Sequence, residues 1–462
     1  MDTAKIYDYV IIGSGPSGSV LAKNLADFNF KVALIDRAKN KIPKKNKKDF
    51  IYSPYINYSP FHYSPMFSNQ LGGNSALWNN KIYLISEDEF NSSNWPFPYD
   101  ELKKYSIDLA EKFDINHEDV CKIKKEKEFS YTQSIRAHKL GNLFNFLKIN
   151  ENKNIDIMDN SSPIKVNLDN KKQVIKSIII KNNELGKISE IKISKAIILC
   201  AGGLGNPHLI MNLFEKHNGL IGKYLSDHPH INLSNIKKKE SDKFFKSAKY
   251  FLKENTNKEN NLILNIKNYF AGVQLDFTGD PFLYLRRFFL RTKNKILRKL
   301  ILIFIIFLKF IFDILNKILS LIKIKGKYSY QFFFSQELNI NNSIILDHLK
   351  KDEFGLSKSN INWNISQNDI RSYNKMVDQV LDKKDTNLFN KNKIFVGLHP
   401  SCTTIATDDE KSCVDKNLRL SNYKNIFISG SSVFSGNGIT NPTWTIMTLS
   451  NRLSDYLRNY YK

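Results

Sequence analysis

The stretch Tyr7–Ile12 (YDYVII) is apolar and rich in β-forming residues, and it runs directly into Gly13–Gly18 (GSGPSG). Ser19–Ala26 then has the composition of a helix, and Lys31–Ile35 (KVALI) is a second apolar strand that ends at Asp36. A strand, a GxGxxG turn, a helix, a strand and an acidic residue in this order are typical of a Rossmann-like dinucleotide-binding unit. We therefore expect an α/β fold built around this unit.

Each part of the glycine motif has a physical task. Gly13 permits a tight turn, Gly15 lets the backbone approach a pyrophosphate, and Gly18 lets helix and strand pack closely. The N-terminus of the following helix offers N–H groups and a positive dipole to phosphates. Asp36 stands where a carboxylate accepts a hydrogen bond from a ribose hydroxyl. The motif alone leaves FAD and NAD both open, and the predicted cofactor contacts are Gly13, Ser14, Gly15, Pro16, Ser17, Gly18, Asp36 and Arg37.

The composition excludes several classes of protein. With 42% hydrophobic and 25% charged residues, the 462-residue chain can bury a core and is not disordered as a whole. The net charge is +24, but Arg supplies only 10 of the 69 basic residues, whereas nucleic-acid sites favour Arg. We therefore expect no nucleic-acid partner. No metal site is expected either, because the cysteines form no CxxC pair: Cys121, Cys200, Cys402 and Cys413.

One segment raises the question of a membrane. Residues 295–323 have the pattern of a long amphipathic helix, with the wholly apolar run 300–308 followed by Lys309, Asp313 and Lys317 along one face. The helix is too polar to span a bilayer, so it either lies on a membrane surface or packs in the core or between protomers. No signal-like apolar segment precedes the first strand, and we expect a cytoplasmic protein, with the inner membrane face as an alternative.

A second group of motifs lies towards the C-terminus. His399–Thr403 (HPSCT) is followed by an arm at Cys413–Leu420 (CVDKNLRL), a strand at Asn425–Phe434, and a helix opened by Asn441–Met447 (NPTWTIM). These four parts resemble, in order, the C-terminal motifs of the glucose–methanol–choline (GMC) oxidoreductases, an FAD-dependent family that oxidises alcohols.

Three further segments carry the same resemblance. Leu71–Trp78 (LGGNSALW) is similar to the family's loop near the flavin, Ala196–Pro207 to its "vilaaGaieSP" strand and turn, and Ile221–Pro229 to its "vGryl.DHp" motif. Residues 335–363 resemble the branch with pyranose 2-oxidase and the sugar dehydrogenases. The resemblance fades over 86–155 and 235–325. The additional cofactor contacts that it implies are Gly72, Gly73, Asn74, Ser75, Trp78, Ala201, Gly202, Gly430, Ser431, Pro442 and Thr443.

The sequence departs from the family pattern at three positions. Leu77 stands where pyranose 2-oxidase has the His that tethers FAD, so non-covalent FAD is expected. Cys402 replaces the Gly of the family's HxxGT pattern, which is expected to change the geometry of that loop. Gly430 stands where many members have Asp.

The resemblance also implies roles in catalysis. His399 would act as the base that takes the hydroxyl proton while hydride passes to flavin N5, and Asn441 would hydrogen-bond the substrate oxygen. Pro442 would start a helix near the pyrimidine edge of the flavin. His228, in Asp-His-Pro, is expected to have a structural or flavin-proximal role, and the other histidines none: His62, His117, His138, His208, His217, His230 and His348.

We expect a mixed α/β architecture. A discontinuous FAD-binding domain takes residues 1–85, 155–232 and 388–462, with a helical excursion at 86–154 and a β-sheet substrate domain at 233–387 that includes the helix at 295–323. Within the first domain, 164–166, 174–181 and 188–193 are expected to form a small β-meander.

The predicted function is FAD-dependent oxidation of a CH–OH group, of a sugar or sugar derivative. A dehydrogenase that passes electrons to a quinone is favoured over an oxidase, because peroxide made in the cytoplasm would be harmful. The alternative is a catalytically silent GMC-fold protein that acts as a membrane-surface interaction module, which the departures at Cys402 and Gly430 would allow.

Overall fold

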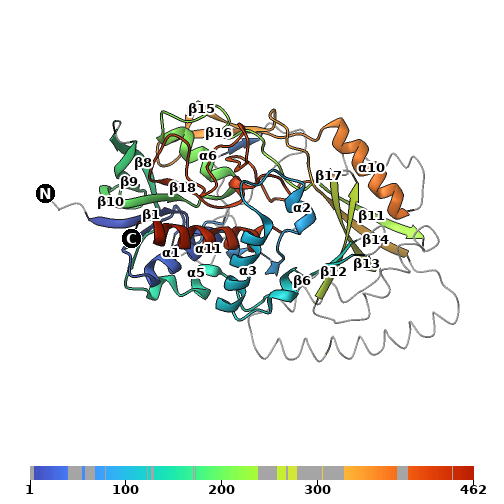
Figure 1. Ribbon diagram of the computed structural model, residues 1–462. Helices are drawn as coiled ribbons and strands as arrows, with labels where there is room; N and C mark the ends of the chain where they lie inside the picture. The colour runs from blue at the N-terminus through green and yellow to red at the C-terminus, as the bar shows by residue number, and fades with distance from the viewer. Residues whose placement is uncertain are drawn as a thin grey trace.

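The computed structural model describes residues 5–39, 55–57, 68–78, 80–121, 123–125, 130–169, 171, 173–237, 258–266, 269–277, 304, 327–381, 394–439 and 441–461. Two β-sheets lie side by side along the molecule, and a short third sheet lies on one flank (Figure 1). The predicted amphipathic helix at 295–323 lies outside the described residues, apart from Phe304. None of the described helices is both long and apolar enough to cross a membrane.

The first sheet contains the predicted dinucleotide-binding unit. Its strands, in order across the sheet, are β7 (Ile155–Met158), β2 (Val32–Ile35), β1 (Ile6–Ile12), β10 (Ile188–Leu199), β9 (Val174–Asn182) and β8 (Ser161–Asp169), and β18 (Ile426–Ile428) also pairs with β10. The pairs β7–β2, β2–β1, β1–β10 and β10–β18 are parallel. β8, β9 and the first half of β10 are antiparallel, which confirms the expected meander.

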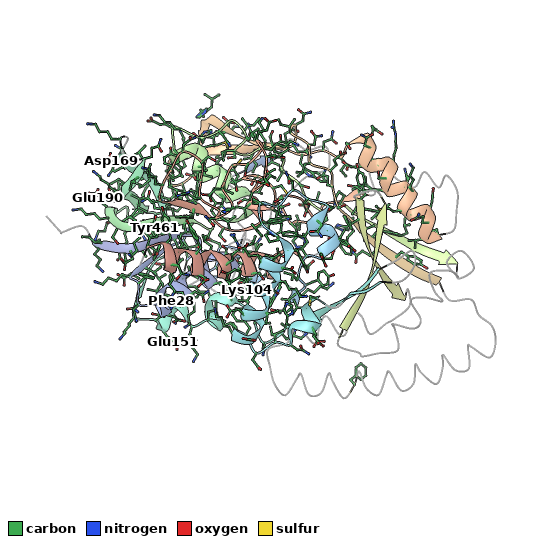
Figure 2. All side chains as sticks on the ribbon, viewed as in Figure 1. Phe28, Lys104, Glu151, Asp169, Glu190 and Tyr461 are labelled. Carbon is green, nitrogen blue, oxygen red and sulfur yellow. The ribbon has the colours of Figure 1, made fainter. Side chains whose placement is uncertain are left out.

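Helices cover this sheet and close its core. α1 (Pro16–Asp27) follows the glycine turn, α6 (Gly202–Leu213) follows β10, and α11 (Thr443–Tyr460) follows β18. Side chains pack closely throughout this half of the molecule, and charged residues such as Glu151 and Glu190 lie at its periphery (Figure 2).

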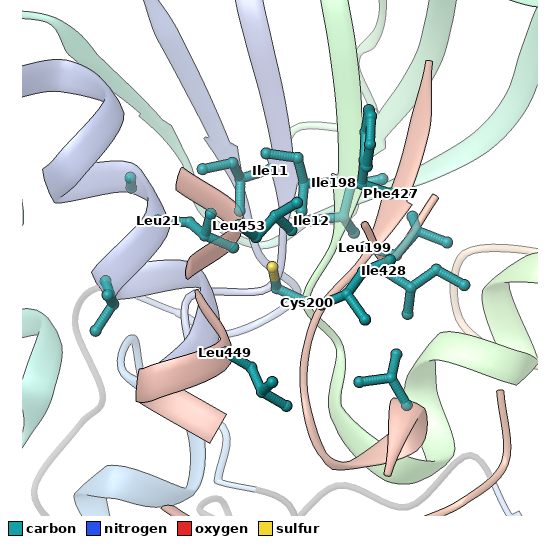
Figure 3. Close-up of a cluster of buried hydrophobic side chains, with 14 of the residues drawn as sticks. Ile11, Ile12, Leu21, Ile198, Leu199, Cys200, Phe427, Ile428, Leu449 and Leu453 are labelled. Carbon is teal, nitrogen blue, oxygen red and sulfur yellow. The ribbon is translucent and has the colours of Figure 1, made fainter. Parts of the chain in front are cut away.

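Parallel strands covered on both faces form near-continuous apolar runs, as β1 and the end of β10 do. Ile11, Ile198 and Phe427 of three adjacent strands gather with Leu21 of α1 and Leu453 of α11 (Figure 3). All five are fully buried, and burying each such side chain contributes about 1.5–3 kcal/mol.

The second sheet is antiparallel throughout. Its strands, in order, are β17 (Ile394–Phe395), β11 (His230–Lys237), β14 (Lys327–Phe334), β13 (Tyr269–Phe277), β12 (Lys258–Ile266), β6 (Ser130–Arg136) and β4 (Lys81–Ile82), with β5 (Ile123–Lys125) on β6. α10 (Gln367–Leu381) packs beside it, and the Tyr373 ring of α10 stacks 4.3 Å from the Phe334 ring of β14.

The segment 86–154 joins the two sheets. It holds α2 (Glu87–Asn91), α3 (Tyr99–Lys112), α4 (His117–Cys121) and α5 (Leu143–Phe146), and in addition the strands β5 and β6 of the second sheet. It is therefore less purely helical than the sequence suggests. The third sheet consists of β15 (Ser343–Lys351), β16 (Ser357–Asn362) and β3 (Tyr55–Asn57).

Candidate active site

The glycine turn after β1 is packed so tightly that two of its positions exclude a side chain. Gly13 has φ +105°, and a Cβ there would lie 2.5 Å from the Cys200 carbonyl oxygen. A Cβ on Gly18 would lie 1.8 Å from the carbonyl oxygen of Gly13. Among the described residues, nothing lies within 4 Å of a Cβ placed on Gly15, so the direction that a side chain would take there is open. The turn thus has a closed side towards β10 and an open side at Gly15.

Polar groups converge around this open side. α1 begins at Pro16 after Gly15, with no side-chain cap and no acidic residue in its first turn. Asp36, at the end of β2, accepts hydrogen bonds from Ser14 N–H (2.5 Å) and Ala38 N–H (2.8 Å). The carboxylate is therefore fixed beside the turn, and the first turn of α1 itself contributes no acidic side chain to the positive end of the helix dipole.

The second glycine loop lies directly on the first. Gly72 N–H donates to Ser14 Oγ (2.9 Å), and a Cβ on Gly73 would lie 3.1 Å from Cα of Gly15. Ser75 Oγ donates to the carbonyl oxygen of Gly72. Two further predicted residues have partners in protein, since Asn74 Oδ1 accepts from Ser68 N–H and Trp78 Nε1–H donates to the Gly141 carbonyl oxygen. The structure therefore brings residues 72–75 to the dinucleotide turn.

The turns after β10 and β18 meet at the segment that carries His399. A Cβ on Gly203 would lie 1.9 Å from the Pro400 carbonyl oxygen, which also accepts a hydrogen bond from Ser431 Oγ (2.7 Å). Ala201 N–H donates to Asn206 Oδ1, and Asn206 Nδ2–H donates to Ser432 Oγ. These contacts hold residues 201–203, 400 and 431–432 in one cluster.

The backbone explains two of the departures from the family pattern. Gly430 has φ +133°, a conformation that glycine adopts far more readily than Asp does. Cys402 has φ +66°, so it keeps the left-handed conformation that the family's glycine would permit. The change of loop geometry expected at Cys402 stays a prediction, and the left-handed conformation is strained for a non-glycine residue.

Arg37 is engaged by protein groups. Its guanidinium donates to Asp352 Oδ2 (2.9 Å) and to Ser162 Oγ (3.0 Å), and it lies 4.8 Å from the centre of the Phe354 ring. The Asp352 side chain is fully buried, and that of Arg37 is 21% exposed. Arg37 thus joins β2 to the turn between β15 and β16, and a cofactor contact for it stays a prediction.

Two histidines that are far apart in the sequence form a pair. Nε2 of His228 lies 2.8 Å from Nδ1 of His399, and Nδ1 of His228 lies 2.5 Å from the Gly438 carbonyl oxygen. The carboxylate of Asp227 accepts hydrogen bonds from the main-chain N–H groups of His228 (2.7 Å) and His399 (3.0 Å). One buried carboxylate therefore ties the two main-chain segments together.

The hydrogen-bond network assigns the tautomer of each ring. A carbonyl oxygen only accepts, so Nδ1 of His228 carries the hydrogen and donates to Gly438. Nε2 of neutral His228 must then accept, and Nδ1 of His399 donates to it. In neutral His399 this leaves a lone pair on Nε2. His399 is thereby prepared to accept a proton at that atom.

The surroundings keep both rings neutral. Burial lowers the pKa of His228 to about 4. Burial and the neighbouring His228, His230 and Lys81 lower the pKa of His399 well below its usual range. Both imidazoles are therefore uncharged at neutral pH.

Asn441 lies on the loop that leads from this pair into α11. The loop contacts His228 through the Gly438 carbonyl oxygen, and Pro442 caps the helix with φ −73°. Like α1, α11 has no side-chain cap and no acidic residue in its first turn, which begins at Thr443.

Sequence reasoning missed the partners of His399. The sequence assigns His228 only a structural or flavin-proximal hydrogen-bonding role, and it assigns no role to Asp227 or Gly438. The Asp-His-Pro motif signals a special position, but the pairing of its His with His399 depends on the three-dimensional fold.

Comparisons with known proteins match part of the chain by sequence and the whole chain by fold. Residues 340–450 match the family model described as GMC oxidoreductase. A 143-residue part of the chain is 28% identical to 2-methyl-1,2-propanediol dehydrogenase of Mycolicibacterium austroafricanum, covering 29% of this chain and 25% of that protein. The chain thus matches about a quarter of the length of this curated relative.

Solved structures match over the whole chain at low identity. An Aspergillus oryzae formate oxidase variant, studied for FAD modification, has 13% identity and a TM-score of 0.65, covering 100% of this chain and 99% of its own. Pyridoxine 4-oxidase from Mesorbium loti has 13% identity and a TM-score of 0.60, covering 98% and 99%. The C-terminal residues 340–450 are therefore similar to the GMC oxidoreductases, and the chain as a whole has the fold of these solved structures.

Proposed function

We propose that the protein is an FAD-dependent oxidoreductase that oxidises a CH–OH group, with His399 as the base. The observation that carries this proposal is the His228–His399 hydrogen bond, because with the Gly438 carbonyl oxygen it leaves Nε2 of neutral His399 free to take a proton. The segment 399–403 is also packed against the turns after β10 and β18, which lie at the edge of the sheet where the dinucleotide turn lies.

The residues around the glycine turn fit FAD. The open side of Gly15 and the uncapped start of α1 suit a pyrophosphate, and Asp36 suits a ribose hydroxyl. Residues 72–75, 201–202 and 442–443 would lie along the rest of the cofactor. Leu77 has a hydrocarbon side chain that cannot form a bond to the flavin, which supports non-covalent binding. FAD, when bound, supplies the acceptor for the hydrogen and two electrons that leave the carbinol carbon.

The chemical step divides the alcohol's two hydrogens. The O–H proton would pass to Nε2 of His399, bound FAD would accept the C–H hydrogen with its electron pair, and the C–O bond would become a carbonyl. Nδ1–H of the resulting imidazolium still donates to His228 Nε2, so the hydrogen bond survives the proton transfer. Asn441 would hold the substrate oxygen by donating from its amide.

The substrate we propose is a sugar or sugar derivative, and the acceptor a quinone. The resemblance of residues 335–363 to the sugar-oxidising branch supports the proposal of a sugar substrate. The proposal of a quinone acceptor rests on the amphipathic pattern of 295–323, which would bring the protein to a membrane surface where lipid-soluble quinones lie.

The decisive experiment is an anaerobic screen of flavin reduction against a panel of alcohols and sugars. Bleaching of the flavin by one class of alcohol supports the proposal, and its rate in the His399→Ala variant tests the role of the base. Failure of every alcohol to reduce the parent protein would contradict it and favour the catalytically silent alternative.

The acceptor is tested on the same reduced protein. Reoxidation by a quinone analogue with slow reoxidation by air supports a dehydrogenase, and the reverse result supports an oxidase. Flotation with anionic liposomes of the parent, but not of a Phe304→Asp, Leu308→Asp double variant, would support membrane docking. If neither floats, docking through 295–323 is wrong.

A further inference from the structure

A buried glutamate contacts the loop before α11, the loop whose Gly438 carbonyl oxygen accepts a hydrogen bond from His228. Glu89 is the third residue of α2 and is 2% exposed. Its Oε2 accepts from the N–H (3.2 Å) and the O–H (2.6 Å) of Ser86, and its Oε1 accepts from the N–H of Ile439 (2.7 Å). One carboxylate oxygen therefore caps α2, and the other reaches across to the loop before α11.

The same peptide group connects Glu89 to the histidine pair. The N–H of Ile439 and the C=O of Gly438 belong to one peptide bond, and that C=O accepts from Nδ1 of His228. His228 in turn contacts His399. The carboxylate, the peptide and the two imidazoles thus form one unbroken chain of hydrogen bonds that all point the same way.

The loop before α11 can approach Glu89 this closely because residues 436 and 438 are glycines. A Cβ on Gly438 would lie 2.5 Å from Oε1 of Glu89, so any other residue there would push the carboxylate away. A Cβ on Gly436 would lie 2.1 Å from Oγ of Ser93, which follows α2. Two glycines therefore let this loop lie directly against α2 and the turn after it.

We propose that Glu89 is a positioning residue for His399: it holds the Gly438–Ile439 peptide with its carbonyl towards His228 and, through that peptide, makes Nε2 of His399 a stronger base. Hydrogen bonds in a chain polarise one another, and a carboxylate at the acceptor end draws each hydrogen towards itself. The inference rests on the proposed role of His399 as base.

Several titratable groups surround this chain of hydrogen bonds and shift the pKa values at its two ends. Burial raises the pKa of Glu89 and Asp88 adds to this, while the donors Ser86 and Ile439 favour its ionised form. Tyr99 lies on the same side, and burial raises its pKa, so it stays neutral. At the other end, burial and the neighbouring His228, His230 and Lys81 lower the pKa of His399. The Asp227 carboxylate accepts hydrogen bonds from the main-chain N–H groups of both histidines.

Two variants separate charge from geometry. Glu89→Gln keeps an oxygen that can accept from Ile439 but removes the charge, whereas Glu89→Ala removes both. We expect a fall in the flavin reduction rate of roughly 3- to 10-fold for Gln and 10- to 100-fold for Ala, the latter by analogy with the partners that orient metal-ligating histidines. The matched control is Glu87→Gln, an exposed carboxylate on the same helix turn.

The pH profile of flavin reduction distinguishes an electrostatic role of Glu89 from a merely structural one, which would leave the profile unchanged. With Glu89→Gln, the pKa that governs flavin reduction should fall, because the imidazolium of His399 loses its distant counter-charge. With Glu87→Gln it should stay at the parent value. Equal profiles for the parent and Glu89→Gln, with both folded, would overturn the proposal that the charge tunes His399.

A second readout needs no turnover. Nitrogen-15 spectra of the histidine rings, assigned with His399→Gln and His228→Gln, report which ring nitrogen carries hydrogen. The parent should show His399 with hydrogen on Nδ1, and Glu89→Ala should show a mixture of tautomers. An unchanged tautomer in a folded Glu89→Ala variant would overturn the positioning role. If no alcohol reduces the parent flavin, the proposed function fails, but these spectra still decide the inference.

Discussion

His228 and His399 share a 2.8 Å hydrogen bond although they are 171 positions apart in the sequence. The bond follows from strand pairing. His228 precedes β11 and His399 follows β17, and these two strands are antiparallel neighbours in which His230 faces Phe395. The register of the two-residue strand β17 on β11 thus brings the two histidines together. The Asp227 carboxylate then holds their main-chain N–H groups side by side.

The first prediction concerns the base. His399→Ala should keep its bound FAD but reduce it roughly 10²- to 10⁴-fold more slowly, the usual contribution of a general base. His228→Gln should cause a smaller loss, because it disturbs only the tautomer of His399. Stopped-flow flavin reduction measures both, with His217→Gln as the control. A His399→Ala variant as fast as the parent would show that another group takes the proton.

The second prediction concerns the cofactor. Heat or acid should release free FAD into the supernatant, because Leu77 offers no atom for a tether. Asp36→Ala should weaken FAD binding by about 1.5–3 kcal/mol, through loss of a charge-assisted hydrogen bond and of the contact with Ser14 N–H. Flavin fluorescence of the filtrate measures both, and Asp27→Ala on α1 is the control. Flavin that precipitates with the chain would contradict non-covalent binding.

The third prediction concerns pH and stability. Burial lowers the pKa of His228 and of His230 to about 4 and that of His208 to about 3, whereas in the unfolded chain each is near 6.5. Between pH 6.5 and about 4 the unfolded state therefore binds more protons, and stability falls as the pH is lowered.

The expected slope is about 1.4 kcal/mol per pH unit for each histidine that stays neutral in the fold. Urea unfolding at a series of pH values measures this slope. His208→Asn should lower the slope by up to the contribution of one histidine. The same change at exposed His138 is the control. A free energy of unfolding that rises as the pH falls below 6 would refute the assignment of buried neutral rings.

The fourth prediction concerns the ion pair between Arg37 and Asp352. Asp352→Ala should destabilise the fold by about 3 kcal/mol, because it leaves a mostly buried guanidinium without its carboxylate. It also removes the acceptor of Phe354 N–H and Leu356 N–H. Urea unfolding measures the loss, and Glu353→Ala at the exposed next residue is the control. A double variant with Arg37→Met should recover part of the stability.

Local patterns predicted local structure well. The strand, glycine turn, helix and second strand lie where residues 7–36 indicate, because apolar periodicity and glycine geometry act over a few residues. Contacts between distant segments could not be predicted in this way. Arg37 donates a hydrogen bond to Asp352, which lies 315 positions away in the sequence, and Glu89 accepts one from Ile439, which lies 350 positions away. Glu89 also stands where the family resemblance fades, so neither a pattern nor a resemblance marked it.

The assembly of the first sheet from remote segments has a consequence for biosynthesis. β10 needs β18 as its neighbour, and Asn425 beside β18 donates to the carbonyl oxygen of Lys195, 230 positions earlier. α1 likewise bonds α11, since Asn24 donates to Asn451 and Ser454. On the ribosome the dinucleotide turn is therefore made early, but its sheet and helix layer close only after the C-terminal strand and helix have emerged. Until then β10 has an exposed apolar edge that a chaperone can bind.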